Sequence, residues 1–176
     1  MEDLKYFKQF DIKLSTLIIG LHEFNLIIDK TFFTKHLNEE IKDANIDILL
    51  KVNKKETLYL FDFTLNGNIT LQCDVCLEDM EYPIETEEEL IVKVSLKAGQ
   101  QEDQNIVFIS PNEQTYNVEQ IIYEIIYAQV PMRKAHQDIN KSCDQEMIQW
   151  IAQTSIKQTQ DTDPRWEALK NLKLDK

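Results

Sequence analysis

Alternating apolar and polar positions run through the first two thirds of the chain and predict β-strands. The alternation covers residues 44–52, 57–65 and 68–73 and returns at 88–96. A period of two is typical of strands that bury one face. An Asn-Gly dipeptide at 66–67 separates two of these runs, and this dipeptide favours type I′ turns. We therefore predict a hairpin there, with Leu60 facing Cys73 near its open end.

Shorter apolar segments flank this meander. Residues 10–14, 23–29 and 106–110 predict further strands, and a short helix is expected after the second of them. From residue 118 the apolar spacing becomes helical as far as Pro131, and Asn117 with Gln120 resembles a capping box. A second helix is predicted from about Asp144 to Ala152. The fold class is therefore α+β: a mostly antiparallel sheet or partly open barrel, one long helix packed on it, and a second, shorter helix.

The C-terminal part of the chain differs in composition from the rest. Residues 1–152 are predicted to form a single domain, and the polar residues 153–162 a flexible linker. Residues 163–176 predict a short helix, in which Trp166, Leu169 and Leu172 form an apolar stripe at three-residue spacing. This stripe is a candidate partner-binding surface. A helix that packs on its own domain or frays is the alternative.

Composition and charge exclude several classes of function. The formal net charge is -12 and the glycines are only three, each isolated, so neither a P-loop nor a dinucleotide-binding loop can form. An acidic protein repels phosphate, so we expect no broad nucleic-acid binding, whereas a basic protein partner is compatible with this charge. Solubility alone would also explain an acidic surface. Apolar runs are too short to span a membrane, and three cysteines suit a reducing compartment, so a cytoplasmic location is expected.

Four residues could together form a metal centre. Cys73 and Cys76 make a CxxC pair at the predicted end of a strand, and one later loop carries His136 and Cys143. CxxC commonly supplies two of the four ligands of a tetrahedral zinc ion. If the later loop folds back, it could supply an imidazole and a third thiolate, although the spacing from His136 to Cys143 is wider than in zinc fingers. The predicted cofactor is a structural zinc ion.

Other chemistry for these cysteines is considered as well. A redox pair normally needs a thiol of low pKa at a helix N-terminus. Here a strand is expected after the pair, and Asp74, Glu78 and Asp79 would raise the thiol pKa values in the absence of metal. Buried thiols that hold no metal are a third interpretation. No motif supports a cysteine nucleophile, and the carboxylates between Glu85 and Glu89 are interpreted as a solvated strand face.

Three segments in this order resemble one protein family. They are "NGNITLQCDVCLEDMEYPI", "VEQIIYEIIYAQVPMRKAHQDINKSC" and "DPRWEALKNLK". The set resembles the YceD family of bacterial and chloroplast proteins, named for the accumulation of large-subunit ribosomal RNA. The residues that match the family pattern are the CxxC cysteines Cys73 and Cys76, the stretch from Glu124 through Pro131 to His136 and Cys143, and the tail residues Asp163, Pro164, Trp166, Leu169 and Leu172. Val75 departs from it, because a basic residue is common there, and so does Ala128–Pro131 in the lead-in to the proline.

The resemblance implies a factor that is not an enzyme and that is needed for large ribosomal subunit assembly and 23S rRNA accumulation. Because this chain is so acidic, we expect it to bind the large-subunit precursor through a basic ribosomal protein or one local basic patch, and direct RNA contact stays open. The alternative from another functional class is a cytoplasmic thiol-disulfide oxidoreductase that uses Cys73 and Cys76.

Overall fold

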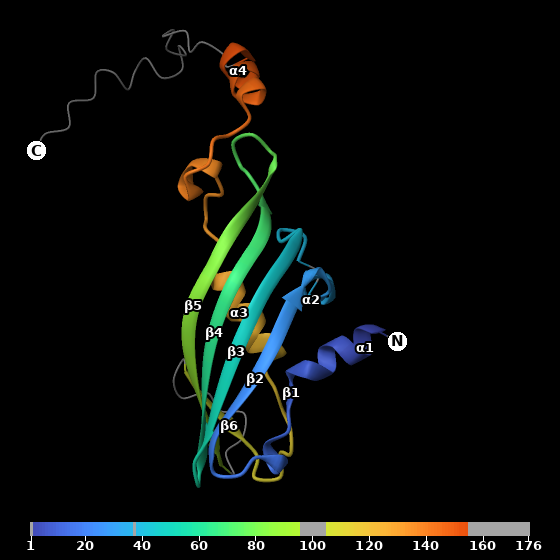
Figure 1. The fold of residues 1–176 in the computed structure, drawn as a ribbon, viewed down its shortest axis with the longest axis vertical. Helices are drawn as coiled ribbons and strands as arrows, with labels where there is room; N and C mark the ends of the chain where they lie inside the picture. The colour runs from blue at the N-terminus through green and yellow to red at the C-terminus, as the bar shows by residue number, and fades with distance from the viewer. Residues whose placement is uncertain (1, 37, 96–104, 155–176) are drawn as a thin grey trace, which may run out of the picture. The chain divides into compact units, whose positions relative to one another are not determined.

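A computed structural model describes residues 2–36, 38–95 and 105–154 of the chain. The chain divides into two compact units, Met1–Cys143 and Asp144–Lys176. The first unit has an α+β fold built on one five-stranded sheet (Figure 1). This confirms the predicted fold class in its coarse form, as an open sheet and not a closed barrel.

The sheet follows the order of the chain. Its strands are β2 (Gly20–Asp29), β3 (Asp43–Lys54), β4 (Leu58–Gln72), β5 (Asp79–Val94) and β6 (Ile106–Ile109). From β2 to β5 neighbouring strands are antiparallel, whereas β6 runs parallel to β5, so the sheet is mixed. β3 and β4 bury alternate residues, because one face of the sheet packs on the core and the other faces solvent. In β2 only Leu26 and Ile28 are buried, and the inward residues of its first half are half-buried.

The predicted hairpin at residues 66–67 is wrong. Both residues lie inside the continuous strand β4, which pairs with β3 on one side and β5 on the other, and Leu60 faces Ile91 instead of Cys73. A type I′ turn needs positive φ at both central residues, and among the described residues only Gly20, Leu77 and Asn140 have it.

Gly67 is required in β4 for a different reason. A Cβ atom built there would lie 2.1 Å from the carbonyl oxygen of Asn45 and 2.6 Å from the Cα of Ile46. Both atoms belong to the main chain of β3, which cannot give way as a flexible side chain would. The Asn-Gly pair therefore marks a close approach of two strands and not a turn.

Short elements complete the first unit. They are α1 (Glu2–Phe7), η1 (Lys8–Phe10), β1 (Asp11–Ile12), η2 (Leu14–Thr16), α2 (Lys30–Lys35), β7 (Tyr116–Asn117), α3 (Glu119–Ala128) and η3 (His136–Ile139). The strand predicted at 10–14 is reduced to β1, which pairs with β7, because 3-10 turns occupy both flanks. The strand predicted at 23–29 and the helix after it are confirmed as part of β2 and as α2.

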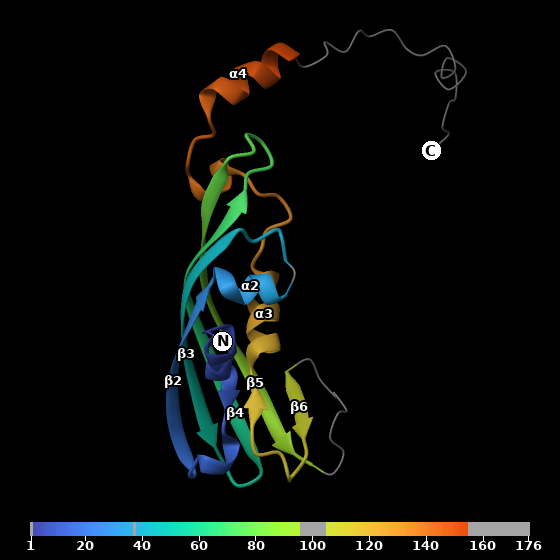
Figure 2. The same cartoon turned by 90° about the vertical axis from the view of Figure 1, so that its right-hand side faces the viewer.

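Helix α3 covers the inner face of the sheet together with α2 (Figure 2). Its apolar side, Ile122 and Ile126, is fully buried, and so are the inward residues of β3 and β4. The expected capping box is wrong, because the N-cap is Val118 and the Gln120 amide donates to Glu124. Asn117, one residue earlier, accepts a hydrogen bond from the Glu119 N–H group at 2.9 Å with its side-chain oxygen. The distinction between one long and one shorter helix is not confirmed, because α3 and α4 each have ten residues.

Helix α4 (Gln145–Thr154) belongs to the second unit and confirms the helix predicted from about Asp144. The Asp144 carboxylate accepts hydrogen bonds from the N–H groups of Glu146 and Met147 and caps it. The predicted tail helix, with Trp166, Leu169 and Leu172, lies outside the described residues. Within the described part, no helix is long and apolar enough to cross a membrane.

Candidate metal centre

The turn between β4 and β5 supplies the first half of the candidate centre. Cys73 directly follows β4, and its N–H group donates to the Glu78 carbonyl at 2.8 Å, while the Leu77 N–H group donates to the Cys73 carbonyl at 2.9 Å. These two bonds close a six-residue turn that carries both cysteines. Leu77 has a φ of 62°, which is rare for a leucine and lets the chain reverse immediately after Cys76.

The loop after α3 supplies the second half. His136 opens the 3-10 helix η3, and this helix ends at Asn140, whose φ is 57°. The Lys141 N–H group donates to the His136 carbonyl at 2.8 Å and closes the turn, after which the chain reaches Cys143. Leu77 and Asn140 are the two non-glycine residues with positive φ among those described. Each therefore bends the backbone next to one half of the cluster.

Two hydrogen bonds between Asp74 and Lys134 join the two halves. The Asp74 N–H group donates to the Lys134 carbonyl at 2.7 Å, and the Lys134 N–H group donates to the Asp74 carboxylate at 2.7 Å. The Lys134 ammonium group also donates to Glu40 at 2.7 Å, and this bond raises the pKa of Lys134. The loop after α3 is thus held against the CxxC turn by hydrogen bonds that involve no metal.

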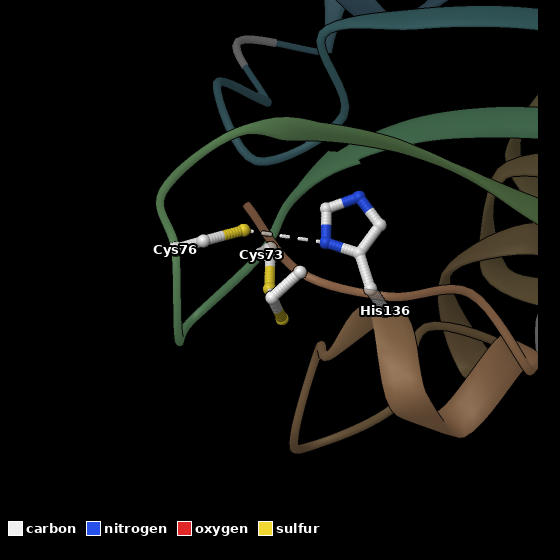
Figure 3. Close-up of side chains that lie close together, drawn as sticks. Cys73, Cys76 and His136 are labelled. Carbon is white, nitrogen blue, oxygen red and sulfur yellow. Dashed lines mark hydrogen bonds between the residues drawn. The ribbon is translucent and has the colours of Figure 1, made fainter. Parts of the chain in front are cut away.

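Cys73, Cys76, His136 and Cys143 converge at this junction. Their ligand atoms all lie within 4.8 Å of one another. The Sγ atoms of Cys73 and Cys143 are 3.8 Å apart, and Cys76 Sγ lies 3.3 Å from Nδ1 of His136. Figure 3 shows the Cys76 and His136 side chains pointing toward one another from different segments.

These distances fit the edges of a metal-centred tetrahedron. With metal–sulfur bonds of about 2.3 Å and metal–nitrogen bonds of about 2.05 Å, two sulfurs are about 3.8 Å apart and a sulfur and a nitrogen about 3.5 Å. The observed separations of 3.8 and 3.3 Å agree closely with these values. A disulfide would need about 2.05 Å between sulfurs, and none of the three cysteines forms one.

The main chain favours a thiolate at Cys73. Burial acts to raise the pKa of this thiol, but the N–H groups of Cys76, Val75 and His136 outweigh burial and lower the pKa to about 6. Cys143 shows the opposite shift, because burial and then the neighbouring thiols Cys73 and Cys76 raise its pKa to about 11. The expectation that nearby carboxylates would raise the pKa values of the thiols is not met. The Asp74 carboxylate accepts a hydrogen bond from the Lys134 N–H group instead.

Burial restricts what this arrangement can do chemically. All four residues are buried, with at most 8% of any of them exposed. A redox cysteine must be reached by its substrate, whereas a structural metal is normally enclosed by its ligands. Three thiols and one imidazole, gathered from two loops and held by their own hydrogen bonds, are a ligand set that suits a metal ion.

The structure thus brings together all four residues that the sequence proposed as ligands. Sequence reasoning missed the pairing of Asp74 with Lys134 and the backbone bends at Leu77 and Asn140. Asn140 was the detectable signal among these, because asparagine adopts positive φ more readily than most residues. No pattern marks Leu77.

Comparison with known proteins adds the family. The profile described as "Large ribosomal RNA subunit accumulation protein YceD" matches residues 61–173, well over half of the chain. The chain belongs to the YceD family. The match includes β4 from Phe61 onward and all four residues of the candidate centre.

A curated relative of this YceD-family chain comes from Bacillus subtilis (strain 168). It is the "Uncharacterized protein YlbN", which is 26% identical over 155 residues that cover 85% of this chain and 87% of the relative. The likeness therefore extends over nearly the whole length of both chains. No solved structure gives a significant match.

Proposed function

We propose that this chain is a factor in assembly of the large ribosomal subunit and in accumulation of its 23S RNA, and that it acts by binding a ribosomal component instead of catalysing a reaction. The observation that carries this proposal is the match to the YceD family over residues 61–173, whose description names accumulation of the large ribosomal RNA subunit. The net charge of -12 is compatible with a basic ribosomal protein as the component that is bound.

A zinc ion is the proposed cofactor. When bound, zinc would join four ligands that belong to two separate loops and would raise the stability of the folded state. Cys73 and Cys76 would hold it from the sheet side, and His136 and Cys143 from the loop after α3. The lowered pKa of Cys73 prepares one thiolate, and the Asp74–Lys134 pairing holds the two loops in register. The role of the metal is thus structural, to fix the loop that leads to the C-terminal unit.

The proposed partner is a basic ribosomal protein. The net charge of -12 disfavours broad contact with RNA phosphates and favours a cationic partner. Carboxylates also lie in one row across the outward face of the sheet. Asp47 on β3 and Glu85 on β5 flank Asn66 of β4, which faces each of them. Opposite charge on the partner would speed the encounter and select the correct surface.

One observation favours the rival function, a thiol-disulfide oxidoreductase. The pKa of Cys73 is lowered to about 6, as in redox-active cysteines. The same shift is expected for a metal-binding thiolate, however, and Cys73 and Cys76 are both almost completely buried. The convergence of His136 and Cys143 on the pair has no role in a simple CxxC redox cycle, so the metal-dependent assembly factor explains more of the site.

Depletion in cells tests the assembly role. We expect loss of the chain to lower the ratio of large to small subunits in gradient sedimentation and to lower 23S RNA relative to 16S RNA. Re-expression of the wild-type chain should restore both ratios, whereas Cys143→Ser at equal protein level should restore them only in part. Normal subunit and RNA ratios after complete depletion would contradict the proposal. A purified chain that carries no metal and reduces disulfides would favour the rival.

A further inference from the structure

Strand β2 forms one edge of the main sheet, and part of that edge has open hydrogen-bonding groups. β2 pairs with β3 alone, in a register that runs without a break from Gly20–Lys54 to Asp29–Asn45. In an antiparallel pair, the main-chain groups of alternate residues point away from the partner strand. In β2 these are the odd-numbered residues, as the contacts of Ile27 show.

At Ile27, side chains from the N-terminal segment occupy the edge. The Gln9 amide accepts a hydrogen bond from the Ile27 N–H group at 3.2 Å and donates to the Ile27 carbonyl at 3.2 Å. Two residues further along β2, the Asp29 N–H group donates to the Tyr6 hydroxyl at 3.1 Å. Gln9 thus satisfies the same two groups that a neighbouring strand would satisfy. The protein closes this half of its edge with side chains.

The other half of the edge stays open. By the same alternation, the N–H and C=O groups of Leu21, Glu23 and Asn25 point outward, and all three residues are exposed. Within the described part of the chain, no hydrogen bond to the outward main-chain groups of these three residues is found. An exposed edge with free donors and acceptors can accept an added strand.

Exposed apolar side chains lie at one end of this open half. Ile18 and Ile19 come just before β2, and Leu21 is its second residue; they are 74%, 68% and 58% exposed. Exposed aliphatic side chains beside a free strand edge provide contact area for the alternate side chains of an added strand. Main-chain groups and apolar surface therefore point to the same type of ligand, an extended polypeptide.

Charge selects which polypeptide fits. Glu23 lies at the centre of the open stretch, and Asp47 and Asp29 lie on the same outer face, with Lys51 as a basic neighbour of Glu23. A second copy of this chain would be disfavoured, because full antiparallel pairing of Leu21 to Asn25 with itself places two Glu23 carboxylates opposite each other. Each copy also carries a net charge of -12. A segment with lysine or arginine opposite Glu23 avoids both penalties.

We propose that the open edge of β2, from Leu21 to Asn25, binds an extended basic segment of another protein by strand addition. The bound segment would continue the sheet beyond β2, exchange main-chain hydrogen bonds with Leu21, Glu23 and Asn25, and cover Ile18 and Ile19. This inference deepens the proposed function, because it assigns the partner's surface. Its test uses the purified chain without ribosomes, so either proposal can fail without the other.

The test measures binding of two synthetic peptides to the purified full chain. One is a fluorescein-labelled octapeptide of alternating lysine and valine, and the other has glutamate in place of lysine. The informative variant is Asn25→Pro, because proline removes an N–H group that points to the open edge and leaves pairing with β3 intact. Asn25→Ala is the matched control, since it keeps the N–H group. Glu23→Lys tests charge, with Glu85→Lys on β5 as the control of equal charge change.

We expect the wild-type chain to bind the lysine peptide and not the glutamate peptide. Asn25→Pro should weaken binding about tenfold, as expected for loss of one hydrogen bond and obstruction of its neighbour, and Asn25→Ala less than about twofold. Glu23→Lys should weaken binding more than Glu85→Lys does. Thermal unfolding checks that each variant folds, and if Asn25→Pro does not, the two lysine variants decide.

Three results would overturn the proposal. The first is that the chain binds both peptides with equal affinity or binds neither of them. The second is that Glu23→Lys and Glu85→Lys weaken binding equally. The third is a dimer in sedimentation that Asn25→Pro abolishes. The last result would identify a second copy of the chain as the occupant of the edge.

Discussion

Removal of metal from the Cys73–Cys76–His136–Cys143 cluster should lower the stability of the first unit by a calculable amount. Two of the ligand separations, 3.8 and 3.3 Å, match the edges of a tetrahedral site, and all four ligand atoms lie within 4.8 Å of one another. At free metal one hundred times its Kd, binding adds about 2.7 kcal/mol to the free energy of unfolding.

This free energy translates into a measurable change in Tm. With an unfolding entropy of about 2.1 cal/mol/K per residue over residues 1–143, 2.7 kcal/mol corresponds to about 9 °C. The assay is thermal unfolding of the purified chain with and without a strong chelator, together with elemental analysis of the metal content. We expect about one zinc ion per chain and a fall in Tm of about 9 °C when the chelator removes it.

A ligand variant and a neighbouring control separate metal binding from simple packing. Cys143→Ser should carry little metal, unfold at a lower temperature than wild type and show no further response to chelator. Lys141→Ser, an exposed position two residues away, should behave as wild type. If chelator changes neither the metal content nor the Tm of the wild-type chain, while Cys143→Ser still lowers the Tm, the thiols act only by packing and the metal interpretation is refuted.

Three further predictions follow from the fold and the site. Gly67→Ala should destabilise the protein by about 3 kcal/mol in denaturant unfolding, because its Cβ would meet the main chain of β3. Asn66→Ala, on the exposed face, should change stability by less than about 0.5 kcal/mol. A larger loss of stability in Asn66→Ala than in Gly67→Ala would support a turn. Metal binding at pH 7 should release the proton of Cys143, whose pKa is about 11, whereas Cys73, with a pKa of about 6, is already mostly a thiolate. Calorimetry in buffers of different ionisation enthalpy measures the number of protons released, and absence of proton release would contradict the ligand role of Cys143. Asp74→Ala removes the acceptor of the Lys134 N–H group and should weaken metal affinity about tenfold in a competition titration. Unchanged affinity would show that the Asp74–Lys134 pairing does not contribute to metal binding.

The side-chain period along the chain was sufficient to predict most of the elements. Alternation located β3, the two halves of β4 and the second half of β5, and helical spacing with a proline stop located α3. These patterns report directly which face of an element is buried. The same local reasoning failed at residues 66–67. The local preference of an Asn-Gly pair is for a turn, and the close approach of the β3 main chain to Gly67, which only glycine allows, is visible only in the folded sheet.

The four candidate ligands were chosen from residue type alone, since cysteine and histidine are the residues that hold zinc. Their convergence depends on long-range features that no local pattern encodes. The Asp74–Lys134 pairing joins segments sixty residues apart, and the positive φ of Leu77 and Asn140 turns each segment toward the other. The open edge of β2 is likewise a property of the assembled sheet, because Gln9 bonds the outward main-chain groups of Ile27, whereas no described segment bonds those of Glu23. Sequence determined which groups are available for binding, and tertiary structure decided which of them meet, because contacts between distant segments form only when the whole sheet has folded.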